Sequence, residues 1–340
     1  MRNVCEPLMV LNEEDAREVM PGIAESWSVN EDFSIYTFHI RPNLTFPSGN
    51  PVTAHDVAWS MNRSLQLNLS SSKRLKEWGF NKHNIGDLVR VIDDLTLEVR
   101  PPKKYSPSLF LYALADYRSA HALDRVEVLS HERDGDLGNT WLTRNTACYG
   151  PFRVHTWRAQ DVLILERNEE WTRRENPIRR VVLRHIPEPG TQRLMLEKGD
   201  VDLAASLDPS DLDAIEENPS TWLKRTPTFR TIYMAFNQDT PAFADPRVIE
   251  AMHYLIDYEA IANTVLNKAA IVRESPVPLG MFGELPESFT PYSLDIDKAR
   301  ALLREAGLAE GYSFELLASN AAPYSDIAQH FQENLLKAGV

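Results

Sequence analysis

The spacing of apolar residues in the first half of the chain predicts short strands joined by helices. Residues 33–40 (FSIYTFHI) are dense in β-forming side chains, which predicts a strand buried on both sides or nearly so. Thr53 precedes Asp56 by three residues, a capping-box spacing at the start of an amphipathic helix. Apolar runs around turn residues predict hairpins, and helical spacing predicts two more helices; these lie at 89–99, 152–166, 105–115 and 123–129.

Strands and helices then alternate along the chain. Strands are predicted at 181–186, 201–204 and 231–236, with helices at 191–198 and 211–217 between them. Such βαβα alternation predicts an α/β fold with a mostly parallel sheet covered on both faces. Beyond residue 237 the pattern becomes helical, with one further strand; these elements are expected at 246–256, 258–266, 297–306, 314–317 and 327–338.

Length and charge narrow the classes of protein. A chain of 340 residues exceeds the roughly 250–300 residues at which one hydrophobic core stops growing, so two lobes are expected. The 36 basic and 49 acidic residues give 36 − 49 = −13, which argues against non-specific nucleic-acid binding. We therefore expect no nucleic-acid partner.

The two ends of the chain and its two cysteines give information about the cellular compartment in which the protein resides. The chain shows no run of 18 apolar residues and no signal peptide at its start, a pattern that alone would fit a cytosolic protein. We expect instead that both ends are incomplete, because residues 336–340 finish a helix that should lead into a strand. For Cys5 and Cys148 we expect two buried free thiols; pairing in an oxidising compartment is the alternative.

Catalytic and metal-binding patterns are not evident in the sequence. There is no G-x-S-x-G elbow and no glycine-rich phosphate loop. His131 and Glu132 begin like a zinc-binding helix, but the second histidine is missing and Gly135 opposes a helix there. We therefore expect no catalytic residue, no metal and no cofactor.

Two polar and aromatic segments are candidates for ligand binding. The segment 145–151 combines Asn, Thr and Gly, which let a backbone approach a ligand closely, although Gly150 could equally set a turn before a strand. Arg118 beside an aromatic residue could hold a carboxylate, the alternative being a solvated arginine and a core tyrosine. The candidate ligand-binding residues from these segments are Tyr117, Arg118, Asn145, Thr146, Cys148 and Tyr149.

Several motifs, in order along nearly the whole chain, resemble one known family. They are EPL at 6–8, PGIAESW at 21–27, YTFHIR at 36–41, FPSGNPVTAHDV at 46–57, YGPF at 149–152, LERN at 165–168 with Trp171, GDVD at 199–202 and FN at 236–237. This set resembles the bacterial extracellular solute-binding proteins of family 5, the peptide, oligopeptide and nickel type. Two positions depart from the family pattern: Cys5 stands where tyrosine is usual, and Cys148 replaces a glycine two residues before Gly150.

The resemblance implies a two-lobed periplasmic-binding-protein fold (type II, cluster C) that encloses a ligand between its lobes. Lobe one would span 1–237, with a subdomain inserted at about 42–145, and 238–340 would be the N-terminal part of an incomplete lobe two. The resemblance also adds Asn237 to the candidate ligand-binding residues. The strand that ends there is expected to leave lobe one.

The function implied by the resemblance is that of a monomeric, non-enzymatic, periplasmic or membrane-associated receptor. It would capture a peptide or similar small solute and deliver it to the permease subunits of an ABC importer. One alternative is the same binding module in a transcription regulator, which a basic DNA-binding domain would mark. The other is a hydrolase, which a nucleophile with its base would mark. Neither mark is present in the sequence.

Overall fold

The computed structural model of the protein divides into two compact units, Met1–His185 and Ile186–Val340. It describes residues 3–12, 15, 18–116, 118, 120–205, 207–226, 228, 230–281, 283–286, 288–309 and 311–340. The division concerns packing within each unit, and the lobe boundary expected at residue 237 stays a prediction. Within the described ranges, no helix has the length and apolar character needed to cross a membrane.

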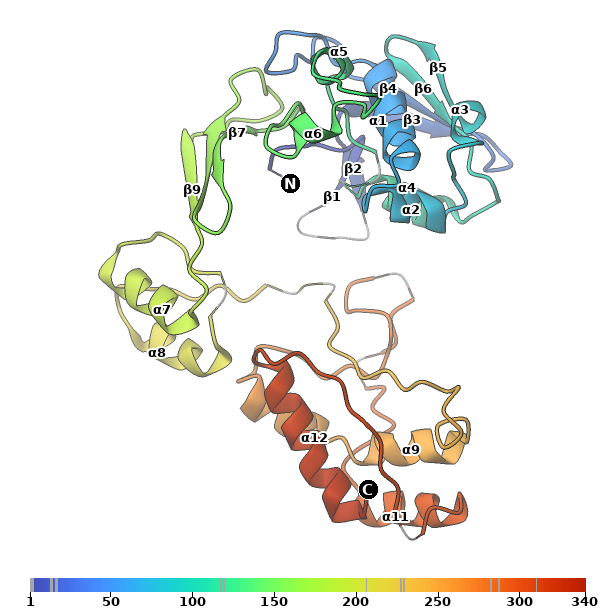
Figure 1. Ribbon diagram of the computed structural model, residues 1–340, viewed down its shortest axis with the longest axis vertical. Coiled ribbons are helices and arrows are strands. Elements are labelled where there is room, and N and C mark those ends of the chain that lie inside the picture. Colours follow the sequence, from blue (N-terminus) through green and yellow to red (C-terminus); the bar gives the residue numbers. More distant parts are fainter. Residues whose placement is uncertain are drawn as a thin grey trace. The chain divides into compact units, whose positions relative to one another are not determined.

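A four-stranded antiparallel sheet organises the first unit (Figure 1). Its strands are ordered β3 (Ala24–Val29), β4 (Tyr36–Ile40), β6 (Thr96–Val99) and β5 (Val89–Asp93). In β4 the side chains of Tyr36, Phe38 and Ile40 are buried, whereas Thr37 is half-buried and His39 is exposed. The prediction of a strand buried on both sides is therefore wrong. Apolar and polar residues alternate along β4, so its apolar side chains face the core and its polar side chains face the opposite side of the sheet.

Helices cover the apolar face of this sheet. Helix α1 (Ala54–Gln66) contacts β5 and β6, and its predicted capping box is present. The carboxylate of Asp56 accepts hydrogen bonds from the backbone N–H and the hydroxyl of Thr53, at 2.9 and 2.6 Å. The remaining helices on this part of the unit are α2 (Ser72–Glu77), α3 (Ile85–Leu88) and α4 (Pro107–Leu114).

Shorter elements complete the first unit. Strands β1 (Met9–Leu11) and β2 (Val19–Pro21) form a two-stranded sheet near the N-terminus. The predicted hairpin at 152–166 is confirmed as β7 (Phe152–Arg158) and β8 (Val162–Arg167), and β9 (Arg180–Arg184) joins it to form an antiparallel sheet. Helices α5 (Arg125–Ser130) and α6 (Asn139–Leu142) lie in the chain between these sheets.

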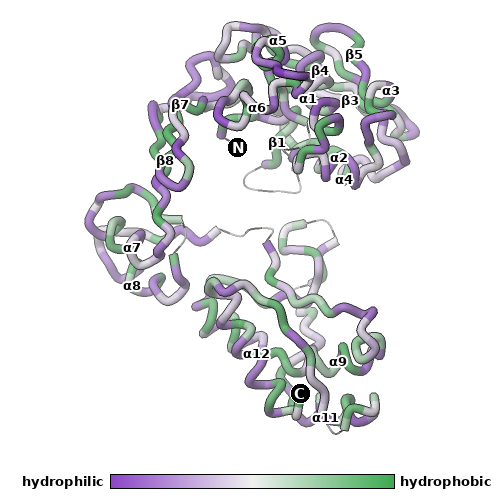
Figure 2. Tube along the Cα trace, in the orientation of Figure 1, coloured by the Kyte–Doolittle hydropathy of each residue, from purple (hydrophilic) through white to green (hydrophobic). Residues whose placement is uncertain are grey.

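The core of the second unit is helical. Helix α9 (Pro246–Tyr254) packs on α11 (Ile296–Glu305), which packs on α12 (Tyr324–Ala338). Figure 2 shows hydrophobic and hydrophilic positions mixed along α12, as expected for an amphipathic helix with one buried face. The other helices of this unit are α7 (Pro189–Lys198), η1 (Pro209–Asp211), α8 (Leu212–Glu217), α10 (Tyr258–Ala260) and η2 (Ile261–Val265).

The predicted parallel sheet is wrong for the described residues, whose sheets are all antiparallel. Segments 201–204, 231–236 and 314–317 belong to none of the described strands. They expose large apolar side chains: Leu203 is 75%, Tyr233 78% and Leu317 84% exposed. An apolar run becomes a strand only when a partner strand completes its hydrogen bonds, and these segments have none within the described ranges.

Cys5 and Cys148 form a disulfide bond, so the expectation of two free thiols is wrong. Backbone hydrogen bonds on either side bring the two segments together. The N–H of Glu6 donates to the carbonyl of Tyr149 at 2.8 Å, and the N–H of Phe152 donates to the carbonyl of Asn3 at 3.0 Å. The expectation that both cysteines are buried is confirmed.

Candidate functional site

Two segments of the first unit contact the N-terminal residues 3–9. The N–H of Leu8 donates to the carbonyl of Ala120 at 2.7 Å, next to the segment that carries Arg118. The disulfide and the Glu6–Tyr149 hydrogen bond attach the other side of residues 3–9 to the loop 145–151. The N-terminal segment therefore connects the two segments in which the sequence places candidate ligand-binding residues.

Gly150 lies where this packing is tightest. A Cβ atom added at Gly150 would stand 2.3 Å from the carbonyl oxygen of Val4 and 2.5 Å from its carbonyl carbon. Both are backbone atoms, which cannot swing aside as the end of a side chain could. The close backbone approach that the sequence suggested at Gly150 is thus an approach to the protein's own N-terminal segment.

A largely buried ion pair also stabilises the position of the N-terminal residues 3–9. The carboxylate of Glu6, which is 5% exposed, accepts a hydrogen bond from the indole N–H of Trp171 at 2.7 Å and pairs with the guanidinium of Arg173. Burial lowers the pKa of Arg173 and raises the pKa of the neighbouring Tyr149. These groups hold the segment in place and have little access to solvent.

A pocket of about 230 Å³ opens beside the loop 145–151, entirely within the first unit. Its walls come from the loop before α1, from α5 and α6, from the loop itself and from β7. The lining residues are Phe46, Pro47, Ser48, Asp124, Glu127, Trp141, Asn145, Thr146, Ala147, Arg153 and Val154. The volume is below the roughly 300–1,000 Å³ that is typical of sites for drug-sized ligands.

Asp124 fixes one wall of the pocket. Its carboxylate is almost fully buried and accepts hydrogen bonds from the hydroxyl of Ser48, from the amide of Asn50 at 3.0 and 3.1 Å, and from the N–H of Glu127 at 3.0 Å. The last bond caps α5, and the others tie the loop before α1 to it. Asp124 is therefore a structural anchor that also places a negative charge at the pocket.

Trp141 and the carboxylate of Glu127 line the neighbouring wall, and His131 contacts both of them. The rings of Trp141 and His131 stack with their centroids 4.3 Å apart and their planes 10° apart. The Nε2 atom of His131 lies 3.2 Å from a carboxylate oxygen of Glu127, one turn earlier in α5. Glu127 keeps 38% of its side chain exposed, so its carboxylate remains accessible from solvent.

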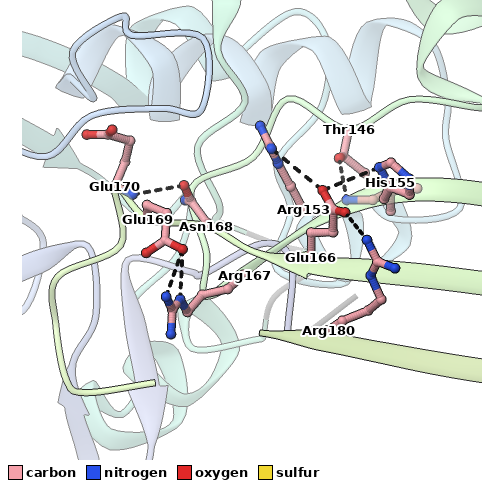
Figure 3. Close-up of polar contacts among 10 residues, drawn as sticks. Thr146, Arg153, His155, Glu166, Arg167, Asn168, Glu169, Glu170 and Arg180 are labelled. Atoms are coloured by element: carbon pink, nitrogen blue, oxygen red, sulfur yellow. Dashed lines mark hydrogen bonds and ion pairs between the residues drawn. The ribbon is translucent and has the colours of Figure 1, made fainter. Parts of the chain in front are cut away.

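Arg153 supplies the positive charge on the β7 side. Figure 3 shows its guanidinium directed at Glu166, with Thr146 nearby, and the closest nitrogen–oxygen distance of the pair is 3.7 Å. The same carboxylate binds Arg180 at 2.7 Å and lies 3.3 Å from His155. Hydrogen bonding from Arg180 is the main cause that lowers the pKa of Glu166. Arg153 therefore shares its carboxylate with two other basic groups.

The structure brings only some of the predicted ligand-binding residues to this pocket. Asn145 and Thr146 line it. Cys148 is held in the disulfide, and the side chain of Tyr149 is fully buried in the core. Tyr117 lies outside the described residues.

The two other predicted residues lie elsewhere. Arg118 is half exposed and pairs with Asp116, at 3.0 Å between the guanidinium and the carboxylate. Asn237 belongs to the second unit, is exposed, and accepts a hydrogen bond from the N–H of Asp239 at 3.0 Å. No contact in the structure tests whether either residue binds a ligand, so both stay predictions.

Sequence reasoning missed the charged residues of the pocket. A signal for one of them is present, because Asp124 and Glu127 have the spacing of a helix cap at the start of the predicted helix 123–129. Nothing local marks Arg153, which is one of several arginines in its hairpin. In the part of the chain that the structure describes, no group of three or more His, Cys, Asp or Glu residues could hold a metal ion.

Comparison with solved structures shows the same fold. The chain aligns with NikZ from Campylobacter jejuni in complex with Ni(L-His) at a TM-score of 0.79 and 22% identity, covering 99% of this chain and 66% of the other. It aligns with the periplasmic binding protein DppA from Helicobacter pylori in complex with the peptide STSA at a TM-score of 0.77 and 21% identity, with the same coverage. The predicted fold class, the two-lobed fold of periplasmic binding proteins, is confirmed.

Comparison with curated proteins identifies relatives of the same kind. The chain is 26% identical to the probable D,D-dipeptide-binding periplasmic protein DdpA of Escherichia coli K12 over 95% of its length, and spans 60% of that protein. It is 26% identical to the periplasmic oligopeptide-binding protein OppA of Salmonella typhimurium, spanning 62% of it. The model of the bacterial extracellular solute-binding proteins, family 5 Middle, matches residues 18–340, and the chain therefore belongs to this family.

Proposed function

We propose that the chain acts in the substrate-binding component of an ABC importer, which captures a peptide or similar small solute and delivers it to the permease. The observation that carries the proposal is the family match over residues 18–340. The names of two relatives, a probable D,D-dipeptide-binding protein and an oligopeptide-binding protein, support a peptide-like solute. The family consists of solute-binding proteins, which supports capture without chemical conversion.

We also propose a periplasmic location and a monomeric state. The relatives named above are periplasmic. The disulfide between Cys5 and Cys148 supports the location independently, because disulfides form and persist in oxidising compartments such as the periplasm. The seven ligand-binding residues predicted from the sequence remain part of this proposal.

Mass spectrometry of the purified full-length protein tests the function. The protein is prepared from the periplasm, examined under native conditions for added mass, then denatured so that any released solute can be identified. A peptide or related small molecule that rebinds in calorimetry and is recovered unchanged after incubation is the expected result. Conversion of the solute by the pure protein, or no rebinding of any released compound, would contradict the proposal.

A further inference from the structure

The segment that forms β7, β8 and β9 is basic, although the chain as a whole is acidic. Residues 152–184 hold 8 arginines and 5 acidic residues, which gives 8 − 5 = +3, whereas the whole chain carries a net charge of −13. A local excess of positive charge attracts anionic partners and speeds their association with that part of the surface.

The two faces of this sheet differ in their surroundings. Successive side chains of a strand point to opposite faces, and directly opposed residues on neighbouring strands share a face. One row of opposed residues packs on the apolar cluster that contains the disulfide; its members are Val154, Leu165 and Val181. The neighbouring row, Arg153, Glu166 and Arg180, therefore lies on the other face.

This other face is open to solvent. The side chains of Arg153 and Arg180 are 53% and 57% exposed. Val182 and Arg184 follow Arg180 along β9 at alternate positions, so they share its face, and both are exposed. The basic face of the sheet is defined here by Arg153, Glu166, Arg180, Val182 and Arg184.

Positive charge exceeds negative charge on the basic face. The carboxylate of Glu166 binds Arg180 at 2.7 Å and also contacts His155, at 3.3 Å (Figure 3). Arg153 lies further from the same carboxylate, at 3.7 Å, so its guanidinium can turn to another anion at small cost. None of the described ion pairs involves Arg184. Three arginines and one carboxylate give 3 − 1 = +2 with His155 neutral.

The arrangement of these charges favours separate carboxylates over a continuous anionic surface. Glu166 lies between arginines, so its negative charge opposes a membrane or a nucleic acid laid across the face. A single carboxylate can instead bind one guanidinium through two parallel hydrogen bonds. Val182, between Arg180 and Arg184, offers an apolar contact to a side chain that lies between two such carboxylates.

We propose that the basic face docks an acidic segment of a partner protein, whose carboxylates pair with Arg153, Arg180 and Arg184. The inference concerns a protein partner and not the solute. It rests on the proposed function only for the assignment of that partner to the permease of the importer. Charge pairs at an accessible surface act mainly on specificity and on the rate of association, so the docking is rapid and sensitive to salt.

Biolayer interferometry with a folded carrier protein tests the assignment. The carrier displays a surface loop of alternating glutamate and serine, and a matched carrier has glutamine in place of each glutamate. A loop within a folded carrier is too large to be captured as a small solute. The unmodified chain should bind the glutamate carrier and not the glutamine carrier. Its association rate should fall between about 0.01 and about 1 M salt, because the screening length shortens from about 30 to about 3 Å.

Variants of the basic face should change this affinity in opposite directions. Arg153→Gln, Arg180→Gln and Arg184→Gln should each weaken binding of the glutamate carrier by roughly two- to fivefold, the factor expected for one surface ion pair. Glu166→Gln should tighten binding by a similar factor, because it removes the carboxylate that competes for the same guanidinium groups.

Two control variants make the same changes of charge elsewhere in the first unit. Arg90 is exposed on β5, which belongs to a different sheet. Glu169 lies beyond the end of β8 and pairs with Arg167 at 2.8 Å. Arg90→Gln and Glu169→Gln should leave the affinity for the glutamate carrier unchanged, and circular dichroism should show that every variant is folded.

The signs of these changes decide the outcome. Weaker binding in Glu166→Gln, or changes in the controls as large as those on the basic face, would overturn the assignment. Binding to phosphatidylglycerol vesicles but not to the glutamate carrier would overturn it in favour of a membrane surface. The mass spectrometry described above judges the proposed function separately. A released solute without carrier binding would refute this inference alone, and carrier binding without any solute would support the basic face and contradict only the proposed function.

Discussion

The disulfide between Cys5 and Cys148 leads to the sharpest prediction about stability. Replacing both residues by alanine removes the bond and leaves small apolar side chains in a cluster that also contains Val4 and Phe152. The cysteines are 143 residues apart in sequence. For a closed loop of this length, the chain-entropy model gives a stabilisation of about 5 kcal/mol, and removal of native disulfides typically costs about 2–5 kcal/mol.

Thermal unfolding can measure this contribution. For a unit of this size, each kcal/mol shifts the midpoint by roughly 2–4 °C, so the loss should lower it by roughly 4–20 °C. Circular dichroism of the full chain should show the shift in the Cys5→Ala/Cys148→Ala variant. The same shift should follow addition of a phosphine reductant to the unmodified protein.

The double-alanine variant is also the control for the reductant. Its midpoint should not respond to the phosphine, because no disulfide remains to be reduced. If the oxidised and reduced forms of the unmodified protein unfolded within about 1 °C of each other, the entropic argument would be refuted for this chain.

Three further predictions concern separate parts of the chain. Gly150→Ala should destabilise the protein by about 1–3 kcal/mol in urea unfolding, because the new methyl group would meet the carbonyl of Val4 at 2.3 Å; Gly86→Ala, with open space around it, is the control. Burial raises the pKa of Glu274, so the folded form binds its proton more tightly than the unfolded chain and stability falls as pH rises above the unfolded value of about 4.3. Glu274→Gln should therefore raise the unfolding midpoint at about pH 7 but not at about pH 4, and no difference between the two pH values would contradict this. Arg118→Ala should weaken calorimetric binding of a carboxylate-bearing solute by roughly 1.5–3 kcal/mol, and an unchanged Kd would remove Arg118 from the site.

Local signals in the sequence predicted the local structure well. The spacing of Thr53 and Asp56 predicted a capping box that the structure contains, because all its atoms lie within one helical turn. The hairpin at 152–166 was predicted for the same reason, from two apolar runs beside a short turn. The order of several family motifs along the chain predicted the fold class. Neither the amino-acid composition nor any single motif would have been sufficient for that prediction.

Contacts between distant parts of the chain could not be predicted in this way. Asp124 anchors a pocket wall through Ser48 and Asn50, which are 76 and 74 residues away in sequence. The disulfide partners are still further apart. Apolar runs such as 231–236 have strand-like composition, yet composition does not say which strand will pair with them. Charged pocket residues such as Arg153 look like any solvated side chain until the fold places them together.

The unpaired segments 201–204, 231–236 and 314–317 have a practical consequence for handling this chain. Within the described residues these segments lie in no strand, and they expose large apolar side chains such as Leu203, Tyr233 and Leu317, which favours association between molecules. Light scattering by the purified 340-residue chain should increase with concentration. Leu317→Lys should suppress that self-association, because a charged side chain at this exposed position opposes the binding of a second chain.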